Sequence, residues 1–108
     1  MLFRSLGVPD DVLRTDGAVS ETCVRAMAAG ARDRTGASWA LAISGVAGPS
    51  GGTPEKPVGT VWMACSGPPG TVARMARLRG DRGQIRLASV FAALQLVREG
   101  LGLSPAQP

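Results

Sequence analysis

Glycine and proline are concentrated between Ser44 and Gly59, a stretch with five glycines and three prolines. Apolar runs of strand length flank it on both sides, Trp39–Ile43 and Val58–Ala64. The stretch is therefore expected to be a shaped loop between two buried strands. Glycine lets a backbone approach a ligand closely, and successive free amides can hold an anion or a carbonyl oxygen.

The loop begins at the expected carboxyl end of a strand, where open α/β sheets usually bind their ligands. The substrate-binding candidates in it are Gly45, Ala47, Gly48, Gly51, Gly52 and Thr53, and Ser44 supplies a supporting hydroxyl. The glycines are equally compatible with turns alone. The chain has neither the Gly-x-x-x-x-Gly-Lys-Ser/Thr nucleotide motif nor the Gly-x-Gly-x-x-Gly dinucleotide motif.

Lys56 is the only lysine of the chain and lies inside this loop. It is a candidate for neutralising a phosphate or a carboxylate, and equally a solvated cation or a partner for Glu55. Thr53 and Lys56 are spaced like a Ser-x-x-Lys nucleophile pair. That pair requires a helix, whereas prolines flank these residues, so the spacing carries little weight.

Two arginines near the expected start of the last helix form a second candidate group. Arg82 and Arg86 are four residues apart and share a helix face, so together they could clamp a phosphate. The structural alternative is that Arg86 covers a sheet edge while Arg82 pairs with Asp81. Function is favoured, because cations at a helix N-terminus oppose the helix dipole and need another reason to be there.

Composition limits the chemistry. The 108 residues include no histidine and no tyrosine, and Cys23 and Cys65 are expected to be unrelated buried thiols, so neither a metal site nor a cofactor is expected. The net charge is +4, and eleven of the twelve cations are arginines, which suits phosphate-bearing ligands. Direct nucleic-acid binding is not expected, because aromatics do not alternate with the basic residues.

The apolar patterns indicate a single α/β domain over residues 1–103, followed by a tail over 104–108. The expected elements are a helical turn after Pro9, a helix from Ser20 to Gly36, strands over 38–44, 58–65 and 71–79, and a largely buried helix from Gly80 to Gly100. The first two strands should be buried on both faces and the third exposed at an edge. The architecture expected is a layered α/β/α sandwich with a small mixed sheet. No apolar run is long enough to cross a bilayer and no secretion signal begins the chain, so a cytoplasmic location is expected.

Several strings in this chain resemble the C-terminal domain of the CinA competence/damage-inducible family, which also occurs as a stand-alone nicotinamide-nucleotide amidohydrolase. The most specific string runs from Gly51 to Val61, Gly-Gly-Thr-Pro-Glu-Lys-Pro-Val-Gly-Thr-Val. The others are Leu6–Val8, Gly17–Glu21, Ser44–Pro49, and Gly80–Arg82 with Arg86. Together they extend over nearly the whole chain.

The resemblance implies hydrolysis of the carboxamide of nicotinamide mononucleotide to nicotinate mononucleotide and ammonia, by a serine nucleophile and a lysine base without a metal. It places Ser44 beside the scissile amide, the backbone of residues 45–52 around the substrate, and Arg82 near its polar groups. The family nucleophile lies in an upstream Ala-Glu-Ser-Cys-Thr-Gly-Gly segment that these 108 residues lack, and the base position falls on Leu2. The sheet is accordingly expected to be incomplete, without the family's N-terminal strand-helix-strand segment.

Three interpretations follow from this departure. In the first, the chain is an amidohydrolase domain that is shortened at its N-terminus. In the second, it is a non-catalytic remnant that binds a pyridine nucleotide or another phosphate ligand. In the third, it is an interaction module that pairs its open sheet edge with another chain. The expected partners are a small pyridine nucleotide and further copies of the chain, with neither nucleic acid nor membrane. Apolar surface is expected to be exposed where the missing elements would pack.

Overall fold

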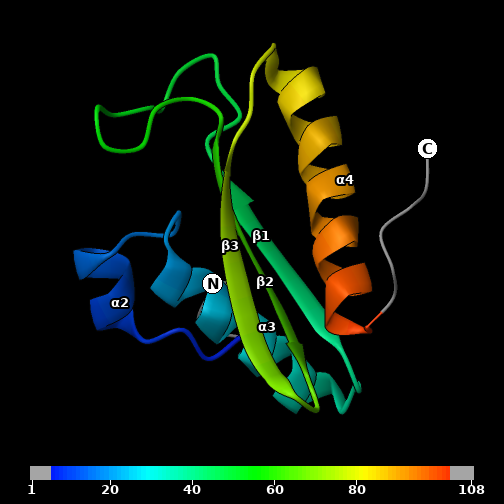
Figure 1. Ribbon diagram of the computed structural model, residues 1–108. Coiled ribbons are helices and arrows are strands. Elements are labelled where there is room, and N and C mark those ends of the chain that lie inside the picture. Colours follow the sequence, from blue (N-terminus) through cyan, green and yellow to red (C-terminus); the bar gives the residue numbers. More distant parts are fainter. Residues whose placement is uncertain (1–5, 103–108) are drawn as a thin grey trace, which may run out of the picture.

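The computed structural model describes residues 6–102, and the expected tail and Leu2 lie outside this range. The elements run in the order α2 (Asp10–Thr15), α3 (Glu21–Thr35), β1 (Ala40–Gly45), β2 (Thr60–Gly67), β3 (Gly70–Arg77) and α4 (Arg82–Gly100). Figure 1 shows a sheet with α2 and α3 on one side and α4 on the other. The predicted α/β/α layering is confirmed.

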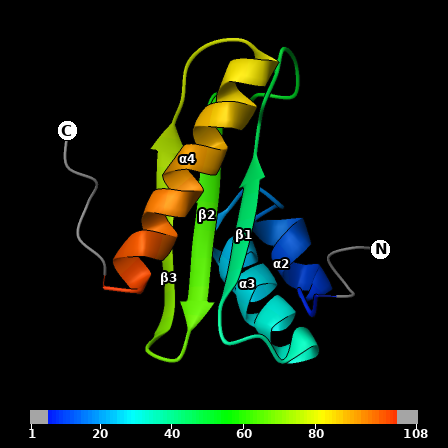
Figure 2. The ribbon, with the colours of Figure 1, turned by 90° about the vertical axis from the view of Figure 1, so that its right-hand side faces the viewer.

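The three strands form a sheet in the order β1-β2-β3, and both pairs are antiparallel. This differs from the mixed sheet expected from the sequence, because each described strand pairs with its neighbour along the chain. β2 and β3 form a hairpin in which Gly67 is opposite Gly70. Figure 2 shows the three strands side by side behind α4.

The expectation that the first two strands are both buried on two faces is correct only for β2. In β2, every residue except Trp62 is buried. β1 lies at the edge of the described sheet and Ile43 is 37% exposed, so two-sided burial is wrong for this strand. β3 is exposed and lies at the other edge, as predicted.

Helix α3 begins and ends where its sequence predicts. The Ser20 hydroxyl accepts a hydrogen bond from the Cys23 amide at 3.2 Å, and Gly36 ends the helix in the left-handed conformation, with φ of 72°. Its buried face, which includes Val24 and Ala28, packs against Ala42 and Ala64 of the sheet.

Helix α4 covers the opposite face of the sheet. Asp81 and Gln84 form a capping box at its start, in which each side chain bonds the backbone amide of the other residue. Ile85, Ala93 and Leu96 pack against Val61 and Met63 of β2. The expectation that α4 is largely buried is wrong for its outer side, where Phe91 is 66% exposed.

Both cysteines are free and buried, as expected for two unrelated thiols. Cys23 belongs to the core under α3, and Cys65 to the core under α4. Within residues 6–102 no group of three or more His, Cys, Asp or Glu side chains is placed to hold a metal ion. The described helices include none long and apolar enough to cross a membrane.

Gly30 is a position where a larger residue should not fit. A Cβ atom added to Gly30 would overlap the backbone carbonyl of Leu6, which cannot move aside as a flexible side chain would. Gly30→Ala should therefore lower the free energy of unfolding by about 1–3 kcal/mol in urea titrations. Gly83→Ala in α4 is the matched control and should be neutral or stabilising, because its nearest contact is Asp81 Oδ1 at 3.4 Å. Equal effects of the two substitutions would contradict the packing.

The two buried thiols should make stability fall at alkaline pH. Burial raises the pKa of both Cys23 and Cys65, and the Lys56 charge opposes this for Cys23. Because their pKa is raised in the folded state, the stabilisation is complete below the unfolded thiol pKa of about 8.5 and is lost as the pH rises above it. Urea midpoints measured from neutral to alkaline pH should show this decline. In Cys23→Ala/Cys65→Ala the decline should be weaker, and an equal decline would assign it to other groups.

Candidate functional site

A cavity of about 370 Å³ opens between the carboxyl end of β1 and the first turns of α4. Its walls are mostly apolar and come from β1 and the residues after it, from β2 and from α4: Ile43, Gly45, Ala47, Val61, Ile85, Arg86, Ser89 and Val90. Arg86 is the only charged residue among them. An apolar hollow with one cation suits a small ligand that carries an aromatic ring and an anionic group.

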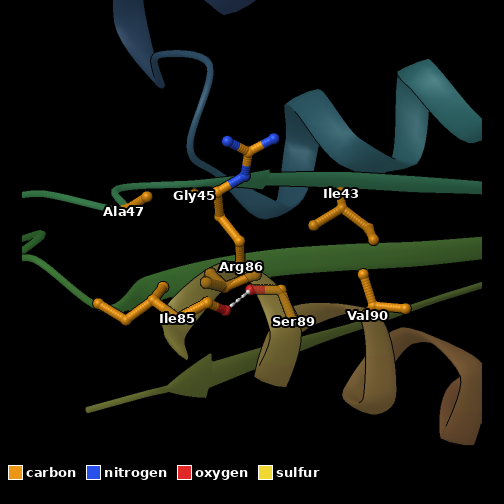
Figure 3. A pocket seen from close by; sticks show the side chains of 8 residues that line it. Ile43, Gly45, Ala47, Ile85, Arg86, Ser89 and Val90 are labelled. Atoms are coloured by element: carbon orange, nitrogen blue, oxygen red, sulfur yellow. Dashed lines mark hydrogen bonds between the residues drawn. The ribbon is translucent and has the colours of Figure 1, made fainter. Parts of the chain in front are cut away.

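Figure 3 shows the Arg86 side chain extending from α4 toward β1, beside Gly45. Arg86 is exposed, and within residues 6–102 its guanidinium forms no ion pair or hydrogen bond. It is thus available to an anionic ligand at the cavity. Ser89 is not available in the same way, because its hydroxyl donates to the Ile85 carbonyl at 2.7 Å.

Arg82 contacts the glycine loop rather than the cavity. Its Nη1 donates to the Gly48 carbonyl at 3.2 Å, and it makes no ion pair with Asp81 in the described chain. Arg82 therefore bonds the loop while Arg86 stays free at the cavity, and their joint clamping of a phosphate stays a prediction. The contact with Gly48 explains why a cation is tolerated at the start of α4.

The loop between β1 and β2 keeps several backbone amides unpaired. Its base continues the strand ladder, since the Val46 amide donates to Thr60 at 2.9 Å and the Gly59 amide to Val46 at 2.7 Å. Further out, residues 47, 48 and 50–52 donate no backbone hydrogen bond to any other described residue. Gly48 has φ of 82°, and a Cβ there would lie 2.6 Å from Val58 Cγ1. The Gly48–Pro49 peptide is cis. These amides could hold an anion, and the anion-holding role expected from the sequence stays a prediction.

Lys56 has a partner that the sequence alone does not indicate. Its Nζ donates to the carbonyl of Asp16, 40 residues earlier, at 2.6 Å. Its amide donates to Thr53 Oγ1, and the Thr53 amide donates to the Lys56 carbonyl, each at 3.0 Å. Neither Lys56 nor Thr53 is among the residues that line the cavity. Together they fold the end of the loop and fasten it to the turn after α2.

The remaining predicted residues lie around the same end of the sheet without lining this cavity. Gly51 and Gly52 are exposed in the loop. Ser44 is half-buried in β1, and strand alternation places it with Ala42 on the sheet face that α3 covers, whereas the cavity opens on the α4 face. The structure thus brings Gly45, Ala47 and Arg86 together and joins Arg82 to Gly48. It leaves Ser44 on the other face of the sheet and Lys56 in the loop outside the cavity.

The apolar lining residues Ile43, Val61 and Val90 were not among the predicted site residues. In the sequence they look like ordinary core residues of two strands and a helix, since apolar spacing does not distinguish a cavity wall from a filled core. The only available signal was the position of Ile43 just before Ser44 and Gly45.

The contact between Lys56 and Asp16 gives a test of how the loop is held. Lys56→Met keeps most of the side-chain volume and removes the hydrogen-bond donor. It should therefore lower the free energy of unfolding by no more than about 1–3 kcal/mol. It should also speed hydrogen exchange in residues 53–59 more than in the strands. Lys56→Arg, which retains a cationic donor, is the control and should remain close to the original protein. Unchanged exchange in Lys56→Met would show that the contact does not hold the loop.

Comparison with known proteins agrees with the fold. The model of the CinA C-terminal domain family matches residues 3–101. A CinA-like protein of Anaeromyxobacter sp. (strain K) is 54% identical over 98 residues, which are 91% of this chain and 24% of that protein. The chain therefore spans about a quarter of the length of the curated relatives that it matches.

Solved structures give the same result. The competence/damage-inducible protein CihA of Agrobacterium tumefaciens superposes with a TM-score of 0.87 and 40% identity, covering 91% of this chain and 61% of that one. The competence damage-inducible protein A of Klebsiella pneumoniae superposes with a TM-score of 0.85 and 37% identity, with the same two coverages. With the family model matching most of its residues, the chain belongs to the CinA C-terminal domain family.

Proposed function

We propose that this chain carries the substrate-binding part of a nicotinamide-nucleotide amidohydrolase site and binds a pyridine mononucleotide there. The observation that supports this most is the cavity of about 370 Å³, at which the glycine loop and the unpaired Arg86 guanidinium meet. Its volume is at the lower end of ordinary ligand sites, roughly 300–1,000 Å³. Membership of the CinA family adds the substrate class that the sequence resemblance implies.

Each part of the site has a role in this proposal. The apolar walls formed by Ile43, Val61 and Val90 would take the pyridine ring, and Arg86 would pair with the phosphate. The free amides of Ala47 and Gly48 would donate hydrogen bonds to the polar edge of the ligand. Arg82 would act indirectly, because its bond to the Gly48 carbonyl fixes the loop against α4.

The reaction itself requires groups that these 108 residues do not supply. In the proposed chemistry a serine oxygen attacks the carboxamide carbon, ammonia leaves with a proton from the base, and water then hydrolyses the acyl-serine to the carboxylate. The upstream serine segment does not occur in the sequence, and the only lysine donates to the Asp16 carbonyl. We therefore propose that the chain binds the nucleotide but does not hydrolyse it by itself.

The cytoplasmic location expected from the sequence stays a prediction.

Isothermal titration with nicotinamide mononucleotide tests the binding proposal. The 108-residue protein should bind, and Arg86→Ala should weaken binding about tenfold or more, because a charge-assisted hydrogen bond is lost. Arg14→Ala, which removes an exposed arginine of α2 outside the cavity, is the matched control and should bind normally. No binding at millimolar ligand, or equal weakening by the two substitutions, would reject the site.

An ammonia-release assay on the same protein separates binding from catalysis. The chain should release no ammonia above the buffer rate, since neither the family nucleophile nor its base is present. A stand-alone nicotinamide-nucleotide amidohydrolase is the positive control and should release ammonia under the same conditions. Ammonia release by the 108-residue chain at the rate of that protein would refute the division between binding and chemistry.

A further inference from the structure

Strand β1 is at one edge of the described sheet, and Figure 2 shows it as the outermost strand on that side. Just beyond the strand, the Val46 amide donates to the Thr60 carbonyl at 2.9 Å, so the backbone of Val46 faces β2. Successive residues of an antiparallel pair alternate between bonded and non-bonded positions, so the amides and carbonyls of Leu41, Ile43 and Gly45 face away from β2. No loop, turn or side chain of the described residues bonds these groups.

The opposite edge of the sheet is protected by charge. On β3 the Thr71 carbonyl accepts a hydrogen bond from Arg25 Nη1 at 2.8 Å, and the strand itself carries Arg74 and Arg77. Charged side chains on an edge strand commonly prevent it from pairing with another chain. β1 has the uncharged sequence Ala-Leu-Ala-Ile-Ser-Gly, and the stretch 35–54 around it contains no charged residue. β1 is therefore the edge that is open to a further strand.

The edge of β1 is complementary to the same edge of a second copy. Both strand pairs of the sheet are antiparallel, and a two-fold axis through Ile43 would continue this pattern. Ile43 then lies opposite Ile43 of the second copy, and Leu41 lies opposite Gly45, so the outward-facing groups of the two strands meet in register. Although the chain has a net charge of +4, no like charges oppose each other along this strand.

We propose that the outer edge of β1 is a homodimer interface in which the β1 strands of two copies pair antiparallel, with Ile43 of one copy opposite Ile43 of the other. The interface centres on one short strand and is smaller than the roughly 800 Å² per partner that stable complexes bury. The dimer should therefore be weak, with a dissociation constant on the order of 10 µM. The pairing uses backbone groups in the plane of the sheet and does not depend on nucleotide binding.

Amide hydrogen exchange at two protein concentrations, about tenfold below and tenfold above this dissociation constant, tests the proposal. At the higher concentration the amides of Leu41, Ile43 and Gly45 should exchange about threefold more slowly, because most of the protein is then dimeric. The Met75 amide, on the β3 edge, should exchange at the same rate in both samples. Sedimentation equilibrium of the same samples should show the mass rising from 11.0 kDa toward twice that value.

A proline at the centre of the strand tests the edge directly. Ile43→Pro removes an outward-facing amide but no bond between β1 and β2, which an edge strand tolerates, and it should weaken the dimer at least about tenfold. Met75→Pro is the matched control. The Leu78 amide donates to the Gly59 carbonyl, so by alternation the Met75 amide also faces outward, and Met75 is 39% exposed against 37% for Ile43. This control should dimerise normally, and circular dichroism checks the fold of both variants.

Ile43→Lys decides the question if the proline variant does not fold, because it keeps the backbone amide. It places two like charges opposite each other across the two-fold axis and should weaken the dimer about fivefold, whereas Met75→Lys should not. A mass of 11.0 kDa at both concentrations would overturn the proposal. So would a dimer in which the amides of Leu41, Ile43 and Gly45 gain no protection, or equal weakening by the Ile43 and Met75 substitutions.

Discussion

The burial of β2 between two helical layers is the constraint on which the rest of the structure depends. Residues on alternate faces of this strand enter both cores, with Ala64 under α3 and Met63 under α4. Both other strands pair with it, and neither pairs with the other. Because β1 and β2 are antiparallel neighbours, the end of β1 lies beside the start of β2. Both ends of the glycine loop that joins them are therefore fixed.

The loop is held at three further points, by elements from different parts of the chain. Val46 extends the strand ladder, Lys56 reaches the turn after α2, and Gly48 accepts a hydrogen bond from Arg82 of α4. These contacts involve the two ends and one carbonyl of the loop, while the amides of its middle remain unpaired. Such a frame positions the loop and leaves its middle amides without a partner among the described residues, which suits the proposed preorganised binding site.

The sequence predicts the elements whose signals are local. Ser20 and Gly36 define α3 through its caps, and two apolar runs locate β1 and β2 to within two residues. An apolar run cannot show how many neighbours a strand has, so β1 was expected to be buried on both faces although it lies at an edge. For the same reason α4 was expected to be buried, although Phe91 and Leu94 are exposed in the single chain.

The site was predicted less completely than the fold, for a physical reason. The loop and Arg86 became candidates because a glycine cluster and cations at a helix N-terminus are unusual residue patterns. The partner of Lys56 could not be identified, because a hydrogen bond to a backbone carbonyl 40 residues away has no signature in the sequence. The face on which Ser44 lies depends on the register of β1 with β2, which tertiary packing sets.

A backbone amide NMR titration of the 108-residue protein with nicotinamide mononucleotide would show whether the loop and Arg86 form one binding site. The amides of residues 45–48 and 50–52 and of Arg86 should shift together with one dissociation constant. The groove at the other end of the sheet, which includes Ala29 and Gly36, should not respond. No shift at millimolar ligand, or shifts confined to that other groove, would contradict it.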